Sequence, residues 1–288
     1  MTRKSYDISG KIDKYPLEII ESINAASEKL SIPFFIVGAT ARDIILEYVY
    51  SKLVYRATND IDFGVSVNTW NSFNALKSLL AEDGKFSIDK KIEHRLLYNG
   101  IYPVDIVPFG KIASKSGTFK WPIEQNEFTV MGFDEAYNYS DIVKVKSSPD
   151  LTVKFAAPHS LVVLKIISWN ERYPERTTDA SDIMLIIESY LEAGNQERLY
   201  DEESDLVDGN FDFTYTGARL LGRDISRTFN NKTLKFILNI LESETSDNSS
   251  YRLIRDMMKP QRPDEESKFD YYLKILSSLK TGIEDNFK

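Results

Sequence analysis

The sequence predicts an α/β (α+β) protein in which a sheet-forming part is followed by a helical part. Between residues 34 and 156, short apolar or alternating runs recur between glycine, proline and asparagine turn signals, and some are separated by helical periodicities. From residue 158 onward, the periodicity is almost wholly helical. We therefore predict two domains, residues 1–150 and 151–288, with a boundary near the polar, proline-containing segment 147–158.

The composition limits the chemistry that the protein can perform. The chain has 288 residues, of which 42% are hydrophobic, so it can bury a substantial core. It contains no cysteine and only two histidines, so a metal must be held mainly by oxygen ligands, which favours Mg²⁺ or Mn²⁺. The net charge of −8 disfavours a broad nucleic-acid-coating surface. No signal peptide or membrane-spanning run is recognised, and we expect a soluble cytoplasmic protein without membrane contact.

A strand, a small-residue turn and a helix follow one another early in the chain. Residues 34–37 form an apolar run, Gly38-Ala39-Thr40 is a tight turn, and residues 41–50 have helical periodicity. This succession presents free backbone N–H groups to an anion at the start of the helix. It is also compatible with an ordinary connection between a strand and a helix.

The short motif Asp60-Ile61-Asp62 comes next. As a strand, it places both carboxylates on one face, where their repulsion is costly unless a cation lies between them. The motif alone is weak evidence, because 44 acidic residues in 288 predict about seven acid-x-acid pairs by chance. We interpret three other such pairs as solvated surface: Asp201/Glu203, Glu242/Glu244 and Asp264/Glu266.

A predicted β-hairpin supplies a third carboxylate. Two extended runs, residues 92–98 and 101–107, flank Asn99-Gly100, which is a strong hairpin signal. In the second run, Asp105 lies on an otherwise apolar face. It is a candidate third metal ligand beside Asp60 and Asp62, although an aspartate on an edge strand would look the same.

The helical part contains a lysine followed by two aspartates. Lys165 lies on the apolar stripe of a helix predicted over residues 158–170, and it either needs a buried partner or reaches the surface along its aliphatic stem. Asp179 and Asp182 share one face of a helix that begins near Thr178. The helix dipole also favours acids at such a position, which is a purely structural explanation.

Charged residues further along the chain have a less specific interpretation. Arg219, Arg223 and Arg227 recur every fourth residue and form a basic stripe on one predicted helix. We favour an exposed face over a contact with phosphate or acceptor. The acidic segment 201–205 is interpreted as a solvated loop or helix end.

Taken in order, the glycine turn, the Asp-x-Asp strand, the later Asp105 and the helical region resemble the DNA polymerase β nucleotidyltransferase superfamily. The chain is most similar to the bacterial predicted nucleotidyltransferases grouped with AbiEii-type toxins. The segments 164–172, which contains Lys165, and 179–183 resemble the lysine-bearing helix and the acidic motif of that group. The resemblance covers residues 34–190 and implies a mixed-sheet catalytic domain followed by a helical domain.

The resemblance also implies roles for individual residues. Asp60, Asp62 and Asp105 would bind Mg²⁺ or Mn²⁺, and Lys165 would contact phosphate or stabilise the leaving group. The nucleoside triphosphate would contact residues of the glycine turn and the acidic motif, namely Gly38, Ala39, Thr40, Arg42, Asp179 and Asp182. Many superfamily members have serine where this chain has Ala39, and the additional motifs of CCA-adding enzymes are absent from the sequence.

These expectations lead to three functional hypotheses. The leading one is transfer of a nucleoside monophosphate from ATP or another NTP to a hydroxyl of a tRNA end or a protein, in a toxin with an antitoxin partner. The second is transfer to a small molecule such as an antibiotic. The third is a catalytically silent nucleotide-binding or interaction module.

Overall fold

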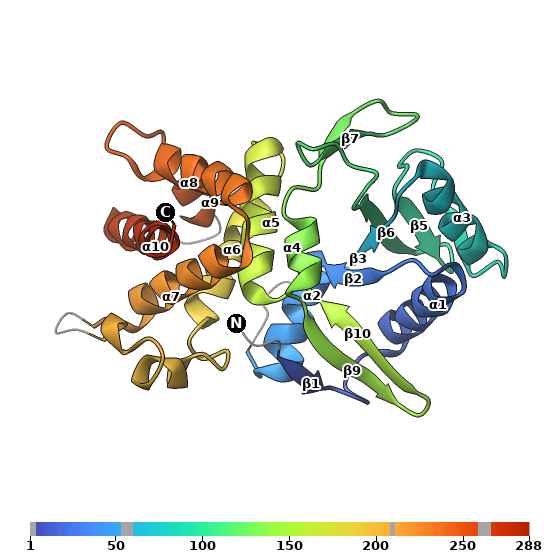
Figure 1. Ribbon diagram of the computed structural model, residues 1–288, viewed down its shortest axis with the longest axis horizontal. Coiled ribbons are helices and arrows are strands. Elements are labelled where there is room, and N and C mark those ends of the chain that lie inside the picture. Colours follow the sequence, from blue (N-terminus) through green and yellow to red (C-terminus); the bar gives the residue numbers. More distant parts are fainter. Residues whose placement is uncertain (1–3, 53–59, 208–210, 259–265, 288) are drawn as a thin grey trace. The chain divides into compact units, whose positions relative to one another are not determined.

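The structure is a computed structural model that describes residues 4–52, 60–207, 211–258 and 266–287 (Figure 1). These residues group into two compact units, which divide between Ala157 and Pro158. The first unit contains a sheet and the second is helical, so the predicted fold class is confirmed. The expected division at 150/151 falls at the start of strand β10 (Asp150–Phe155), which belongs to the sheet of the first unit.

The described part of the first unit is built on an eight-stranded mixed sheet. Its strand order is β1-β9-β10-β2-β3-β6-β5-β4. Besides β10, the strands of this sheet are β1 (Ser5–Asp7), β2 (Phe34–Val37), β3 (Ile61–Ser66), β4 (Phe86–Ile88), β5 (Arg95–Tyr98), β6 (Tyr102–Phe109) and β9 (Asp141–Ser147). The central strands β2, β3 and β6 are mostly buried, as expected of apolar runs in the middle of a sheet.

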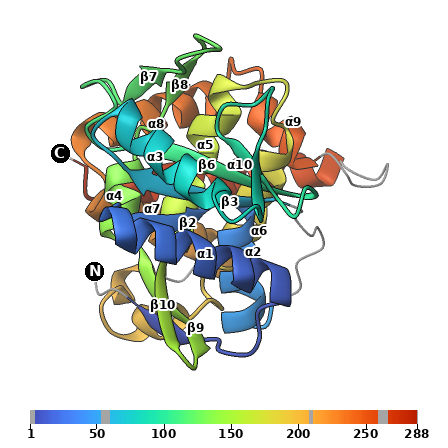
Figure 2. The same cartoon turned by 90° about the vertical axis from the view of Figure 1, so that its right-hand side faces the viewer.

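Two helices, α1 (Lys14–Leu30) and α3 (Trp70–Ala81), lie together on one face of the sheet, in front of the strands in Figure 2. Helix α1 buries Ile19, Ile20 and Ile23 along a single stripe and ends where Ser31 adopts a left-handed conformation. Helix α3 is capped by Thr69, whose hydroxyl accepts the backbone N–H of Ser72.

The remaining elements of this unit are short. Helix α2 (Gly38–Asp43) continues into the π-helical turn η1 (Ile44–Val49), and α4 (Phe133–Asn138) follows a small two-stranded sheet. That sheet pairs β7 (Thr118–Lys120) with β8 (Glu127–Thr129), and Trp121 beside it packs on Trp70 and Phe119. Strand β8 ends at Thr129, and Phe133 begins α4.

Two predicted turns have different outcomes. Asn99 and Gly100 both have positive φ and form the hairpin between β5 and β6, as predicted. The segment 147–150, expected to lead into a domain boundary, is instead the turn of the hairpin between β9 and β10. Strands β1 and β4 were not predicted, because each has only three residues.

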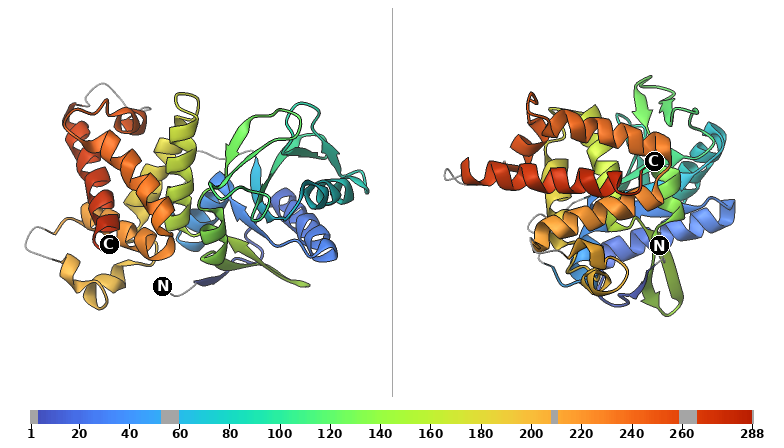
Figure 3. Two further views of the ribbon diagram at one scale, coloured as in Figure 1. Left: turned by 45° about the horizontal axis from the view of Figure 1, so that its top comes forward. Right: turned by 60° about the vertical axis from the view of Figure 1, so that its left-hand side comes forward.

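The second unit is a helical bundle. Its elements are α5 (Pro158–Glu171), α6 (Thr178–Ser189), η2 (Gln196–Tyr200), η3 (Ser204–Leu206), α7 (Phe213–Thr228), α8 (Asn231–Thr245), α9 (Arg252–Met258) and α10 (Glu266–Glu284). Helix α10 packs on α7 and α8 (Figure 3). The approach of α10 to α7 depends on two glycines, because a Cβ at Gly222 would stand 2.2 Å from the carbonyl oxygen of Leu279 and one at Gly282 2.0 Å from that of Arg219.

The arginine stripe of α7 is not a free exposed face. Arg223 donates to Asp205 at 2.6 Å, to Glu203 at 2.8 Å and to Asp285 at 2.7 Å. Arg219 also pairs with Asp285, and Arg227 pairs with Glu203. The interpretation of this stripe as an exposed face holds for Arg227, which is exposed, but is wrong for Arg223, which is buried. The guanidinium groups bond carboxylates of an acidic loop and of the segment after α10.

Two of the acid pairs interpreted as solvated surface also contain a buried member. Glu203 is 2% exposed, while Asp201 is exposed. Glu244 is fully buried. Its carboxylate is compensated by hydrogen bonds from the guanidinium of Arg252 and from the backbone N–H of Leu253 at the start of α9. In the third pair, Asp264 lies outside the described residues.

Asp141 is a buried carboxylate of the first unit. It is 4% exposed, and its Oδ1 accepts the backbone N–H of Lys4 at 3.3 Å. Among the described residues, no hydrogen-bond partner reaches its Oδ2. Burial raises the pKa of Asp141 to about 6, although the N–H and the charge of Lys4 oppose the shift.

We predict that Asp141 makes stability depend on pH. Its ordinary pKa is 3.8, so between pH 4 and 6 the native state binds more protons than the unfolded state, and stability falls as the pH rises. Asp141→Asn should stabilise the protein by up to about 3 kcal/mol at pH 7 but have little effect at pH 4. Urea unfolding of both proteins at each pH measures this. An equal difference at the two pH values would contradict it.

Across the described residues, no helix combines the length and the apolar character needed to cross a bilayer.

Candidate active site

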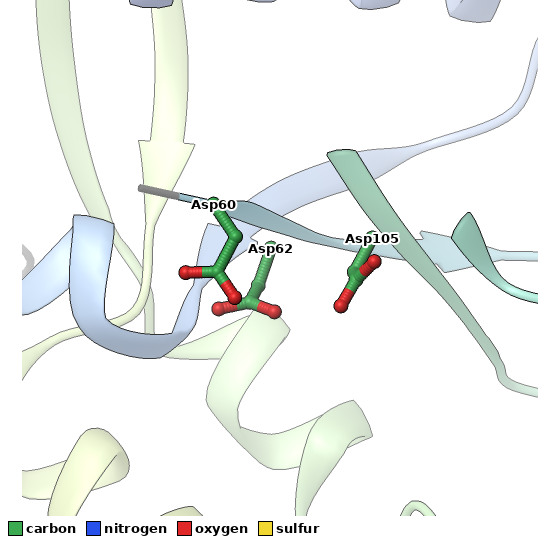
Figure 4. Close-up of side chains that lie close together, drawn as sticks. All are labelled: Asp60, Asp62 and Asp105. Atoms are coloured by element: carbon green, nitrogen blue, oxygen red, sulfur yellow. The ribbon is translucent and has the colours of Figure 1, made fainter. Parts of the chain in front are cut away.

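Three aspartates meet on one face of the central sheet. Asp62 lies on β3 and Asp105 lies directly opposite it on the parallel strand β6, while Asp60 immediately precedes β3. Figure 4 shows all three side chains pointing to the same side of the sheet. One carboxylate oxygen from each lies within 4.8 Å of the others. Asp105 is 6% exposed, and because β6 lies between β3 and β5, it is not an edge-strand residue.

The glycine turn lies against this group. Gly38 follows β2, whose last residue, Val37, pairs with Asp62. Gly38 has φ of +69°, and a Cβ built on it would stand 1.9 Å from Oδ2 of Asp62. Both the backbone conformation and the close approach of the carboxylate therefore require glycine at this position.

Hydrogen bonds connect the turn to the aspartates. The Thr40 hydroxyl donates to the backbone carbonyl of Asp60 at 2.7 Å, so it positions the residue that precedes β3. Ala39 is also buried at the start of α2. Arg42 is 1% exposed, and its Nε donates to the Asp43 carboxylate at 2.6 Å. Thr40 therefore bonds the residue before β3, and Arg42 bonds its neighbour Asp43.

The donor set fits a small divalent cation. Three carboxylates from neighbouring positions on one sheet face supply oxygen ligands, which are those that Mg²⁺ and Mn²⁺ prefer. Like charges this close are unfavourable unless a positive charge compensates for them. Asp60, Asp62 and Asp105 are therefore the residues that would hold such an ion.

Arg95 is a residue of this site that the sequence reasoning missed. It lies opposite Asp105 on β5, and its Nε and Nη2 donate to Oδ1 and Oδ2 of Asp105 at 2.7 and 2.8 Å. The pKa of Arg95 is raised, first by this hydrogen bond and then by the charges of Asp105 and Asp60. His94 is also near, with its Nε2 3.7 Å from Oδ2 of Asp105.

The helical unit contains the other predicted group. Lys165 on α5 is 7% exposed, and its Nζ donates to Asp179 at 3.2 Å and to Asp182 at 2.6 Å. Both aspartates are buried on α6. Lys165 therefore has buried partners rather than reaching the surface. Helix α6 begins at Thr178, as predicted, and Thr177 is the residue that precedes it.

The predicted site residues are thus found in two groups. The sheet unit brings together Gly38, Ala39, Thr40, Asp60, Asp62 and Asp105, with Arg42 buried in the same turn. The helical unit brings together Lys165, Asp179 and Asp182.

A glycine turn against an Asp-x-Asp strand, with a third aspartate on the adjacent strand, is the arrangement that the resemblance to nucleotidyltransferases predicts. A profile of the family described as "Nucleotidyl transferase AbiEii toxin, Type IV TA system" matches residues 24–275. The chain belongs to this family. The predicted resemblance is confirmed, and the protein is a nucleotidyltransferase enzyme of the AbiEii toxin type.

Two solved structures have weak similarity to the chain. The antibiotic-resistance factor ANT(2'')-Ia is 15% identical, with 67% of this chain and 98% of that chain covered and a TM-score of 0.38. The Thermotoga maritima CCA-adding enzyme complexed with tRNA is 12% identical, with 95% of this chain and 80% of that chain covered and a TM-score of 0.28. No curated protein matches the chain significantly.

We predict that Mn²⁺ stabilises the folded protein through the three aspartates. At about 100 times its Kd, a ligand specific for the native state adds about 2.7 kcal/mol, or about 5–10 °C in unfolding temperature for a unit of this size. Asp62→Asn should abolish this increase, whereas Asp83→Asn, which changes an exposed carboxylate of the same unit, should retain it. Thermal unfolding with and without Mn²⁺ measures both. A full increase in Asp62→Asn would rule out this site.

Proposed function

We propose that the protein transfers a nucleoside monophosphate from an NTP to a hydroxyl acceptor and releases pyrophosphate. The observation that carries the proposal is the convergence of Asp60, Asp62 and Asp105 within 4.8 Å beside the glycine turn. The acceptor oxygen forms a bond to the α-phosphorus, and the bond from that phosphorus to the oxygen of the β-phosphate breaks. The hydroxyl proton would pass to the carboxylate of Asp105 or to solvent, and the bonding electrons leave with pyrophosphate.

The sheet unit would perform the chemical step. Asp60, Asp62 and Asp105 would hold Mg²⁺ or Mn²⁺, which supplies charge neutralisation at the phosphates and activates the acceptor hydroxyl. The backbone of Gly38, Ala39 and Thr40 would bind the triphosphate. We assign to Arg42, through its contact with Asp43, the task of holding this turn in shape.

The helical unit would contribute a phosphate-binding charge. We propose that Lys165 contacts the phosphates or stabilises the leaving group, and that Asp179 and Asp182 orient its ammonium. The catalytic domain in this proposal is the sheet unit and the accessory domain is the helical one, in place of the division at 150/151.

The assignment to a toxin family supports a proposal for the class of acceptor. A toxin must disable an essential component of the cell, and attaching a nucleotide to a tRNA end or a protein hydroxyl would achieve this. We therefore propose one of these acceptors, an antitoxin partner, and action in the cytoplasm, where NTPs are abundant. An antibiotic acceptor and a silent nucleotide-binding module are the competing functions.

We predict that the protein transfers label from an α-³²P-labelled NTP, but not from a γ-³²P-labelled one, to tRNA or protein in a cell lysate. Asp60→Asn should lower the rate on the order of 10³-fold, since the metal supplies several kcal/mol to such reactions. Asp83→Asn is the matched control and should retain activity.

The alternatives give different outcomes in the same assay. Label found only on an added aminoglycoside would support the antibiotic acceptor. Nucleotide binding without any transfer would support the silent module. Transfer that survives Asp60→Asn would contradict the proposed site.

A further inference from the structure

Arg95 forms a bidentate hydrogen-bonded contact with Asp105. The two residues lie directly opposite each other on the antiparallel strands β5 and β6, so their side chains share one face of the sheet. The guanidinium uses Nε and Nη2 to bond both carboxylate oxygens, at 2.7 and 2.8 Å. Such a bidentate contact fixes the plane of the carboxylate as well as its position.

From this geometry we infer that Arg95 is the positioning residue of the metal site, which holds Asp105 oriented for a divalent cation before and after the cation binds. The inference rests on the proposed function, because it assumes that the aspartates bind a metal. Arg95 acts through Asp105 and does not itself contact the cation.

The bonding capacity of the carboxylate permits this role. An ionised carboxylate offers about four lone-pair sites on its two oxygens, and the bidentate guanidinium occupies two of them. Asp105 can therefore keep both hydrogen bonds to Arg95 and still ligate an ion. His94 does not provide a substitute, because its Nε2 is 3.7 Å from Oδ2 of Asp105, beyond hydrogen-bond distance.

Electrostatics support the same role. Three carboxylates with oxygens within 4.8 Å repel one another, and a guanidinium on one of them reduces the cost of holding them together. Because Asp105 is 6% exposed, water offers little compensation if Arg95 is removed.

The test measures Mn²⁺ binding to the full chain by electron paramagnetic resonance, without nucleotide or acceptor. Hydrogen-bond partners of metal ligands typically change metal affinity 10–100-fold when mutated. We expect Arg95→Gln to weaken Mn²⁺ binding by about 10–100-fold. Arg95→Lys should also weaken it, because an ammonium cannot form the bidentate contact. Lys91→Ala, which removes an exposed positive charge four residues away, should have wild-type affinity.

Activity supplies a second measurement that general damage to the fold would not reproduce. In Arg95→Lys, the metal concentration needed for half-maximal rate should rise, while the rate at saturating metal should approach that of the wild type. Circular dichroism identifies variants that fold. If Arg95→Gln does not fold, the Mn²⁺ affinity of Arg95→Lys tests the positioning role by itself.

The outcomes distinguish the two proposals. Wild-type or tighter Mn²⁺ binding in a folded Arg95 variant would overturn the positioning role, and tighter binding would mean that Arg95 blocks the site instead. Absence of Mn²⁺ binding in the wild type, or binding that Asp62→Asn does not weaken, would overturn the metal site of the proposed function itself.

Discussion

Electrostatic repulsion among three carboxylates is the constraint around which the sheet unit is built. The pairing of β3 with β6 places Asp62 beside Asp105, and the side chain of Asp60 points to the same face of the sheet (Figure 4). Gly38 allows the preceding turn to approach Asp62 more closely than any side chain would permit. The fold therefore keeps negative charges together, which favours a divalent cation at this position.

The helical unit handles buried charge differently. Around Arg223, arginines of α7 and carboxylates from other segments form hydrogen-bonded pairs, so charges of opposite sign compensate locally. Such a network fastens segments together and specifies their arrangement. The contact of Lys165 with Asp179 and Asp182 has the same chemistry but unequal charge, since two carboxylates meet one ammonium. The balanced network around Arg223 therefore acts structurally.

Much of the fold and the convergence of Asp60, Asp62 and Asp105 could be predicted, because strand parity and the glycine turn are local properties of the sequence. Arg95 could not, because its position depends on one residue of hairpin register. A two-residue turn at Asn99-Gly100 would pair Arg95 with Val104 and place it on the opposite face from Asp105. The observed register pairs Tyr98 with Tyr102, which restores Arg95 to the face of Asp105. The burial of Glu203 was equally unpredictable, because its arginine partners come from a separate helix.

The central claim is that these three aspartates form one metal site, and diffraction from crystals soaked in Mn²⁺ tests it most directly. We predict an anomalous peak about 2.1 Å from one carboxylate oxygen of each of Asp60, Asp62 and Asp105. Arg95 should remain bonded to both oxygens of Asp105 in that crystal. A Mn²⁺ peak elsewhere in the chain, or none between the aspartates at saturating Mn²⁺, would contradict a metal site formed by these three residues.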